Sequence, residues 1–159
     1  MQRVLVIGLG WLVVGCSSGP RMDVNYFWYP GASPYGLDHS YAWLDGEDEK
    51  GYNADYQTLV REHVDCIMQC KGFNLAEAEE ADFWVRHYFG RQTQSAETGL
   101  QSYDEAVLII DFIDKSSGAQ LWRGRLLTRI EYELPPAERR ERLKIGVQKM
   151  FKELPGPRN

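Results

Sequence analysis

The chain has 159 residues, a formal net charge of −5 and 43% hydrophobic residues. This length fits one domain with a single packed core, and the acidic balance argues against a nucleic-acid-binding surface, which has to neutralise phosphates with basic side chains. No run in the sequence reaches the roughly 20 apolar residues that a membrane-spanning helix requires.

Residues 1–15 have the layout of a secretory signal peptide. A short start that includes Arg3 precedes an apolar segment, residues 4–14. This segment is too short to cross a bilayer and has the length typical of a signal-peptide core. We therefore expect residues 1–15 to be removed from the mature chain.

The cysteine that follows this segment indicates a lipid anchor. The residues before Cys16 read VVG, and Ser17 follows it. This pattern resembles the lipobox of bacterial lipoproteins, with an aliphatic residue three positions before the cysteine and a small residue directly before it. The resemblance implies a diacylglycerol on the sulfur of Cys16, an acyl chain on its amino group, and a location at the outer membrane facing the periplasm. The alternatives are an ordinary secretory signal with an incidental cysteine and a buried N-terminal helix.

The remaining chain divides into three parts. Residues 16–23 are small and polar and form a lipid-anchored tether, residues 24–155 form the folded domain, and residues 156–159 are a C-terminal tail. An extended residue spans about 3.3 Å, so the tether holds the domain close to the membrane surface.

The first half of the domain predicts two strands and a helix. Residues 24–29 are rich in β-prone side chains and stop at a Pro-Gly pair. Residues 40–44 form a second short strand. Apolar residues then recur every three or four positions, which predicts a helix with Asn53 as a plausible N-cap and with its end at Gly72.

The second half predicts three strands and a final helix. Side chains alternate along residues 83–89, and a polar loop follows near 91–102. Residues 107–113 are apolar on both faces, as in a central strand. The turn sequence DKSSG leads into a returning strand from Leu121, and an amphipathic helix begins at Ala137.

This order of elements, β-β-α-β-β-β-α, predicts one α+β domain. Short turns between the strands favour a mainly antiparallel sheet, and we expect both helices to pack on one face of it.

At this level of detail the sequence resembles a known family. The segments YAWLD, KGF, ADFWVRHYFG, AVLIIDFIDKSSGAQLWRGR and MFKELP occur in this order. The chain is similar to bacterial envelope lipoproteins that carry domain of unknown function 4136, over most of residues 24–155. The resemblance implies a secreted, lipid-anchored α+β domain and transfers no catalytic residue.

Three residues of the first helix are candidates for thiol or metal chemistry. Cys66 and Cys70 are spaced i and i+4, and their expected Cα separation of about 6.2 Å lies near the long end of the disulfide range. The alternatives are two unpaired small core residues and a bond to another chain. His63 shares their helix face, so His63, Cys66 and Cys70 form a weak candidate for zinc or copper.

The aromatic residues of the first strand are candidates for ligand binding. Alternation places Tyr26 and Trp28 on one face of this strand and their aromatic neighbours on the other, so we expect one pair to stay outside the core. The ligand-binding residues predicted on this basis are Tyr26, Trp28, Arg123 and Arg125. Packing in the core is the alternative for the aromatic side chains, and a solvated strand face is the alternative for the arginines.

No catalytic constellation stands out in the sequence. It lacks a G-x-S-x-G elbow, an H-E-x-x-H motif and a glycine-rich phosphate loop. We therefore expect a non-enzymatic module without a cofactor, which contacts the membrane through its lipid and binds another envelope protein or a cell-wall component. The alternatives are a glycan- or small-ligand-binding lipoprotein and a thiol or metal site on the first helix.

Overall fold

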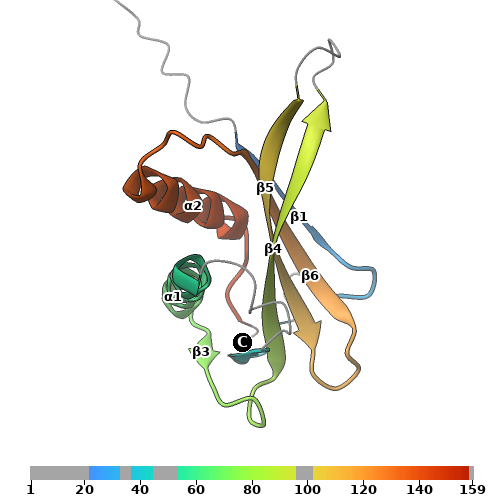
Figure 1. The fold of residues 1–159 in the computed structure, drawn as a ribbon. Coiled ribbons are helices and arrows are strands. Elements are labelled where there is room, and N and C mark those ends of the chain that lie inside the picture. Colours follow the sequence, from blue (N-terminus) through green and yellow to red (C-terminus); the bar gives the residue numbers. More distant parts are fainter. Residues whose placement is uncertain (1–21, 33–36, 45–53, 96–101, 158–159) are drawn as a thin grey trace, which may run out of the picture.

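The computed structural model describes residues 22–32, 37–44, 54–95 and 102–157. They form one six-stranded sheet and two helices that lie on the same side of it (Figure 1). The elements are β1 (Met22–Trp28), β2 (Ser40–Trp43), α1 (Ala54–Cys70), β3 (Asn74–Leu75), β4 (Phe83–Ser95), β5 (Ser102–Asp114), β6 (Gln120–Arg129) and α2 (Pro136–Phe151). The predicted α+β class, with both helices on one face, is confirmed.

The sheet has the strand order β1-β6-β5-β4-β2-β3 and mixed direction. The neighbouring strands β1, β6, β5 and β4 are antiparallel to one another, whereas β2 pairs parallel with both β4 and β3. The sheet is therefore mainly antiparallel, as expected, with parallel pairing at one edge. The chain leaves β2 through α1 and re-enters the sheet beside it, and such a crossover through a helix joins parallel strands. The two-residue strand β3 was not expected.

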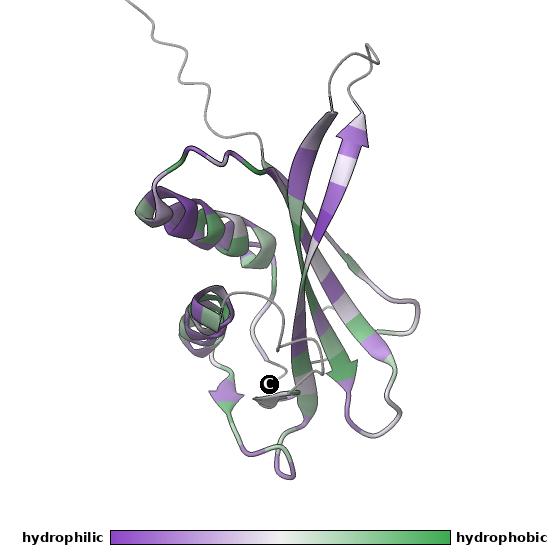
Figure 2. Ribbon diagram, viewed as in Figure 1, coloured by the Kyte–Doolittle hydropathy of each residue, from purple (hydrophilic) through white to green (hydrophobic). Residues whose placement is uncertain are grey.

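The β4–β5 hairpin is longer than its sequence indicates. Polar residues 91–95 continue β4, and the ladder runs on to the pair Ser95–Ser102. Backbone pairing thus carries both strands into the segment that was expected to be a loop, and the hydrophilic end of the hairpin extends past the helices (Figure 2).

The helix boundaries agree with their sequence signals. Gly72, two residues after the last residue of α1, has a φ of +99°, a left-handed conformation that glycine adopts without strain. Asn53, the expected N-cap, lies outside the described residues. Pro136 occupies the first turn of α2, where its missing N–H costs no helical hydrogen bond.

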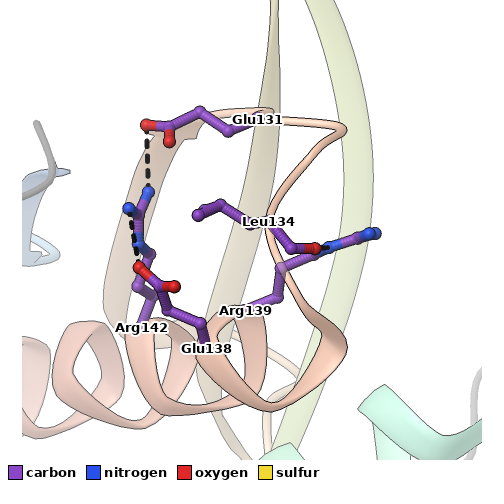
Figure 3. Close-up of polar contacts among 5 residues, drawn as sticks. All are labelled: Glu131, Leu134, Glu138, Arg139 and Arg142. Carbon is purple, nitrogen blue, oxygen red and sulfur yellow. Dashed lines mark hydrogen bonds and ion pairs between the residues drawn. The ribbon is translucent and has the colours of Figure 1, made fainter.

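Polar contacts fix the connection between β6 and α2 (Figure 3). Arg142 bridges Glu131 at 3.0 Å and Glu138 at 3.3 Å, and Arg139 Nε donates to the Leu134 carbonyl at 2.8 Å. The hydrogen bond to Glu131 raises the pKa of Arg142.

The core fills the space between the sheet and the helices. Its aromatic centre is formed by Phe112, Trp122 and Phe151, with ring centroids 4.7 Å apart between Phe112 and Trp122 and 5.2 Å apart between Trp122 and Phe151. Gly124 and Gly146 let α2 approach β6 closely, because a Cβ atom on Gly124 would lie 2.3 Å from the sulfur of Met150. This packing leaves the opposite face of the sheet outside the core.

Candidate functional site

Within the described residues, no helix or strand covers the face of the sheet opposite to α1 and α2 (Figure 1). Paired residues of neighbouring strands point to the same side of a sheet, so the register shows which side chains share this face. The pairs Phe27–Arg123, Arg123–Asp111 and Asp111–Arg86 form one row across four strands. The next row contains Asn25, Arg125, Ile109 and Tyr88.

We call the central part of this surface the open-face patch. It consists of Phe27, Tyr29, Trp84, Arg86, Tyr88, Asp111, Arg123 and Arg125. Three arginines stand against one carboxylate, so the patch is positively charged although the whole chain carries −5.

A buried ion pair forms the centre of the patch. Arg123 donates from Nε and Nη2 to the two carboxylate oxygens of Asp111, at 2.6 and 2.7 Å, and Gln120 adds a third hydrogen bond at 3.0 Å. Asp111 is fully buried, whereas 29% of the Arg123 side chain is exposed. The hydrogen bond with Asp111 raises the pKa of Arg123, and nearby Tyr29 and Tyr88 add to the effect. The guanidinium group therefore stays charged and fixed in place.

Two donors of β4 add unsatisfied polar groups. The Nε atom of Arg86 and the Nε1 atom of Trp84 are buried and have no hydrogen-bond partner among the residues that the structure describes. The Arg86 guanidinium lies 4.7 Å from the centre of the Tyr88 ring, a cation–π distance. Buried polar groups are normally hydrogen-bonded, so these two donors are exceptions within the patch.

This combination of groups is suited to binding. Aromatic rings supply flat apolar surface, and guanidinium groups beside them attract anions and donate hydrogen bonds. The one carboxylate already accepts three hydrogen bonds, so the patch offers cationic and stacking contacts to a partner.

A family model described as "Domain of unknown function (DUF4136)" matches residues 35–156. The chain belongs to this family. The sequence resemblance to DUF4136 is thereby confirmed. No curated protein matches the chain.

Solved structures with a similar fold include a PelC dodecamer from Paraburkholderia phytofirmans, at 12% identity and a TM-score of 0.55, with 86% of this chain and 99% of that chain covered. A PDZ domain protein from Parabacteroides distasonis has 12% identity and a TM-score of 0.57, with 84% of this chain and 36% of that chain covered. At these identities the likeness concerns the fold alone.

The DUF4136 fold separates the four residues that were predicted to bind a ligand together. Tyr26 and Trp28 lie on the face covered by the helices, where the Tyr26 ring stacks on Trp122 at 6.3 Å. Arg123 and Arg125 lie on the open face. The prediction therefore needs a correction, because β1 pairs with β6 in a register that places Phe27, and not its aromatic neighbours, beside Arg123.

The aromatic partners of the arginines could have been found only with that register. Phe27 and Tyr29, whose ring centroids are 5.0 Å apart, alternate with the predicted pair along the same segment. Trp84 and Tyr88 show the same alternation on β4, which indicates a shared face but not which face stays uncovered.

The residues of α1 that were predicted to bind metal do not meet. Within the described part of the chain no group of three or more His, Cys, Asp or Glu side chains could hold a metal ion. Cys66 and Cys70 are exposed free thiols, whereas His63 is half-buried beside Lys144 of α2. Burial lowers the pKa of His63. The pairing of the two cysteines stays a prediction.

A polar cluster that sequence reasoning missed joins α1 to β2. Asp65 accepts hydrogen bonds from the Tyr41 hydroxyl at 2.7 Å and from Trp43 Nε1 at 2.9 Å, and Arg61 lies 5.2 Å from the Trp43 ring centre. Burial raises the pKa of Tyr41. The cluster holds α1 against the covered face of the sheet.

Cys16, the predicted lipidation site, lies outside the described residues. None of the helices in the described ranges is long and apolar enough to span a bilayer.

Proposed function

We propose that this DUF4136 protein is a lipoprotein anchored through Cys16 to the periplasmic side of the outer membrane. Its domain is a non-enzymatic module that binds another envelope component through the open-face patch. The observation that carries the proposal is an arginine- and aromatic-rich surface on a sheet face that no described helix or strand covers, in a chain whose Cys16 follows a lipobox-like sequence.

The composition of the patch supports a binding role. Trp, Tyr and Arg are the residues most enriched among those that dominate binding energies at protein interfaces. Here they surround a fixed ion pair, so the surface is organised before a partner arrives. The PelC protein with a similar fold is a dodecamer, which is an example of this fold in protein–protein contacts.

The length of the tether supports an interaction near the membrane. Only residues 17–21 separate Cys16 from β1. Five extended residues span roughly 17 Å, so the domain contacts partners that lie at or near the bilayer surface. Two or three acyl chains make such anchoring nearly permanent.

The test is crosslinking in intact cells followed by purification of the protein from membranes. We expect a specific partner with the native chain, none with Cys16→Ser, and a strongly reduced yield with Arg125→Glu in the patch. Arg140→Glu is the matched control, because Arg140 is an exposed arginine of α2 that makes an ion pair with Asp55. Retention of the partner by Arg125→Glu, or loss with both arginine variants, would count against the patch.

A second candidate function is binding of an anionic cell-wall glycan by the same patch. The observation that favours it is the Arg86 guanidinium group beside the Tyr88 ring, an arrangement that suits a sugar ring with a carboxylate. Tryptophan fluorescence titrated with peptidoglycan fragments tests it. A saturable change that Arg86→Met abolishes supports glycan binding, and a flat titration with the native chain contradicts it.

A further inference from the structure

Among the described residues, the backbone groups along the outer edge of β1 have no partner strand. Tyr29 donates its N–H to the Leu121 carbonyl at 3.0 Å, so this residue faces β6. In a strand, successive residues point their backbone groups to opposite sides. The N–H and C=O groups of Met22, Val24, Tyr26 and Trp28 therefore point away from β6, toward an edge that no other described strand occupies.

This edge lacks the features that usually protect edge strands. Lysine, proline, a bulge or a very short strand normally prevents pairing with another chain. The β1 sequence MDVNYFW contains no lysine or proline, has Asp23 as its one charged residue, and has seven residues in regular register with β6. Tyr26 is 39% exposed and Phe27 46% exposed, and they are two of the four exposed large hydrophobic residues in the described ranges.

We propose that β1 pairs antiparallel with β1 of a second copy of this chain, about a two-fold axis at Asn25. The two sheets then form one continuous sheet across the dimer. This inference goes beyond the proposed function and holds whether or not the patch binds a partner.

The strand sequence is self-complementary in this register. On the covered face, Met22 lies opposite Trp28 and Val24 lies opposite Tyr26, so apolar side chains meet. On the open face, Asp23 lies opposite Phe27, and the two Asn25 side chains meet at the axis. Each Asp23 carboxylate thus avoids its own symmetry mate, and like charges do not oppose each other.

Charge complementarity continues beyond the two β1 strands. Arg123 is the β6 neighbour of Phe27, so Asp23 of the second copy lies two strand spacings, roughly 9.6 Å, from the Arg123 backbone. Arg123 stays bound to Asp111 on β5, so this carboxylate meets the positive charge of the patch across the gap and forms no ion pair with Arg123.

The other edge of the sheet is a poorer partner for β1. β3 has only two residues, Asn74 and Leu75, and short edge strands resist pairing. Centring the axis on Val24 or Tyr26 instead leaves residues of β1 unpaired at one end. The register about Asn25 is the one that pairs all seven residues of both strands.

Cysteine crosslinking of the full chain in membranes tests this register. The parent chain carries Cys66→Ser and Cys70→Ser, so Cys16 is its one remaining cysteine. A disulfide-linked dimer of this parent shows that the Cys16 thiol is unmodified. This control separates failure of the lipid anchor from failure of the dimer. In this parent, Asn25→Cys places two thiols opposite each other at a non-hydrogen-bonded pair, where Cα atoms are about 4.5 Å apart. We expect a disulfide-linked dimer after mild oxidation.

Two further variants make the register specific. Asp23→Cys and Phe27→Cys should each give little dimer alone and a strong crosslink when the two chains are co-expressed. A chain that keeps only the exposed Cys66 measures random collision in the membrane. Crosslinking at Asn25 no higher than this background, or strong self-crosslinking of Asp23→Cys, overturns the proposal.

A charge change provides a second readout that does not use cysteine. Phe27→Asp places a carboxylate opposite Asp23 twice per dimer, which should weaken association roughly 5- to 30-fold. Phe27→Lys, the matched control, creates two attractive pairs and should leave the dimer intact. Equal effects of the two variants in sedimentation of the detergent-solubilised protein contradict the pairing, and circular dichroism verifies that both are folded.

Discussion

The buried ion pair of the open-face patch predicts unequal effects of removing its two partners. Asp111 is fully buried and 29% of the Arg123 side chain is exposed. Breaking a buried pair costs about 3–5 kcal/mol, because the remaining charge loses its partner. Arg123→Met leaves a buried carboxylate that keeps the Gln120 hydrogen bond but loses both hydrogen bonds from Arg123, so we expect a cost of about 4 kcal/mol. Asp111→Leu leaves a guanidinium that reaches water and costs about 2–3 kcal/mol.

The double variant Asp111→Leu/Arg123→Met removes both charges and should be more stable than Arg123→Met alone. The measurement is the free energy of unfolding from urea titrations followed by circular dichroism at pH 7. Arg86 also lies opposite Asp111, so its guanidinium group can replace that of Arg123 in the single variant. The same cycle is therefore repeated in a chain that carries Arg86→Met, where no second guanidinium group lies next to the carboxylate. The prediction is refuted if the double variant loses as much unfolding free energy as the two single variants together. It is also refuted if Asp111→Leu loses more than Arg123→Met.

Three further predictions concern other parts of the domain. Gly124→Ala places a Cβ atom 2.3 Å from the sulfur of buried Met150, so urea unfolding should show a loss of about 1–3 kcal/mol. Burial lowers the pKa of His63, so the folded state favours its neutral form. The free energy of unfolding should therefore fall as the pH drops below about 6.5, and His63→Gln should make this pH dependence weaker. Cys66 and Cys70 are exposed thiols in the structure, so a maleimide should label both without reductant, whereas protection until reduction would show the i, i+4 disulfide.

The elements that depend on local chemistry were predictable. The alternation along residues 83–89, the helical spacing before Gly72 and the proline at the start of α2 each reflect the conformation of a few neighbouring residues. Such signals are readable because the period of side-chain burial and the backbone freedom of glycine and proline act within one element.

The elements that depend on distant pairing were not. Residues 91–95 are polar, yet they continue β4 because β5 supplies a complete ladder. β3 has two residues and forms only where the end of α1 brings the chain back to β2. The composition of residues 91–95 and that of β3 do not distinguish these segments from a loop.

The candidate site shows the same division. The sequence singled out Arg123 and Arg125 correctly as one strand face, and it recognised that the aromatic residues of β1 divide between two faces. The choice between Tyr26 and Phe27 depends on the register of β1 against β6, and a shift of one residue exchanges the two faces. The contributions of Trp84 and Arg86 depend likewise on which side of the sheet the helices cover.

The central claim is that a lipid on Cys16 holds the domain at the membrane. Mass spectrometry of the intact protein extracted from membranes tests it most directly. The account predicts a chain that begins at Cys16 and carries the added mass of a diacylglycerol and an N-linked acyl group. A chain that retains residues 1–15, or one that begins elsewhere and carries no acyl chains, would contradict it.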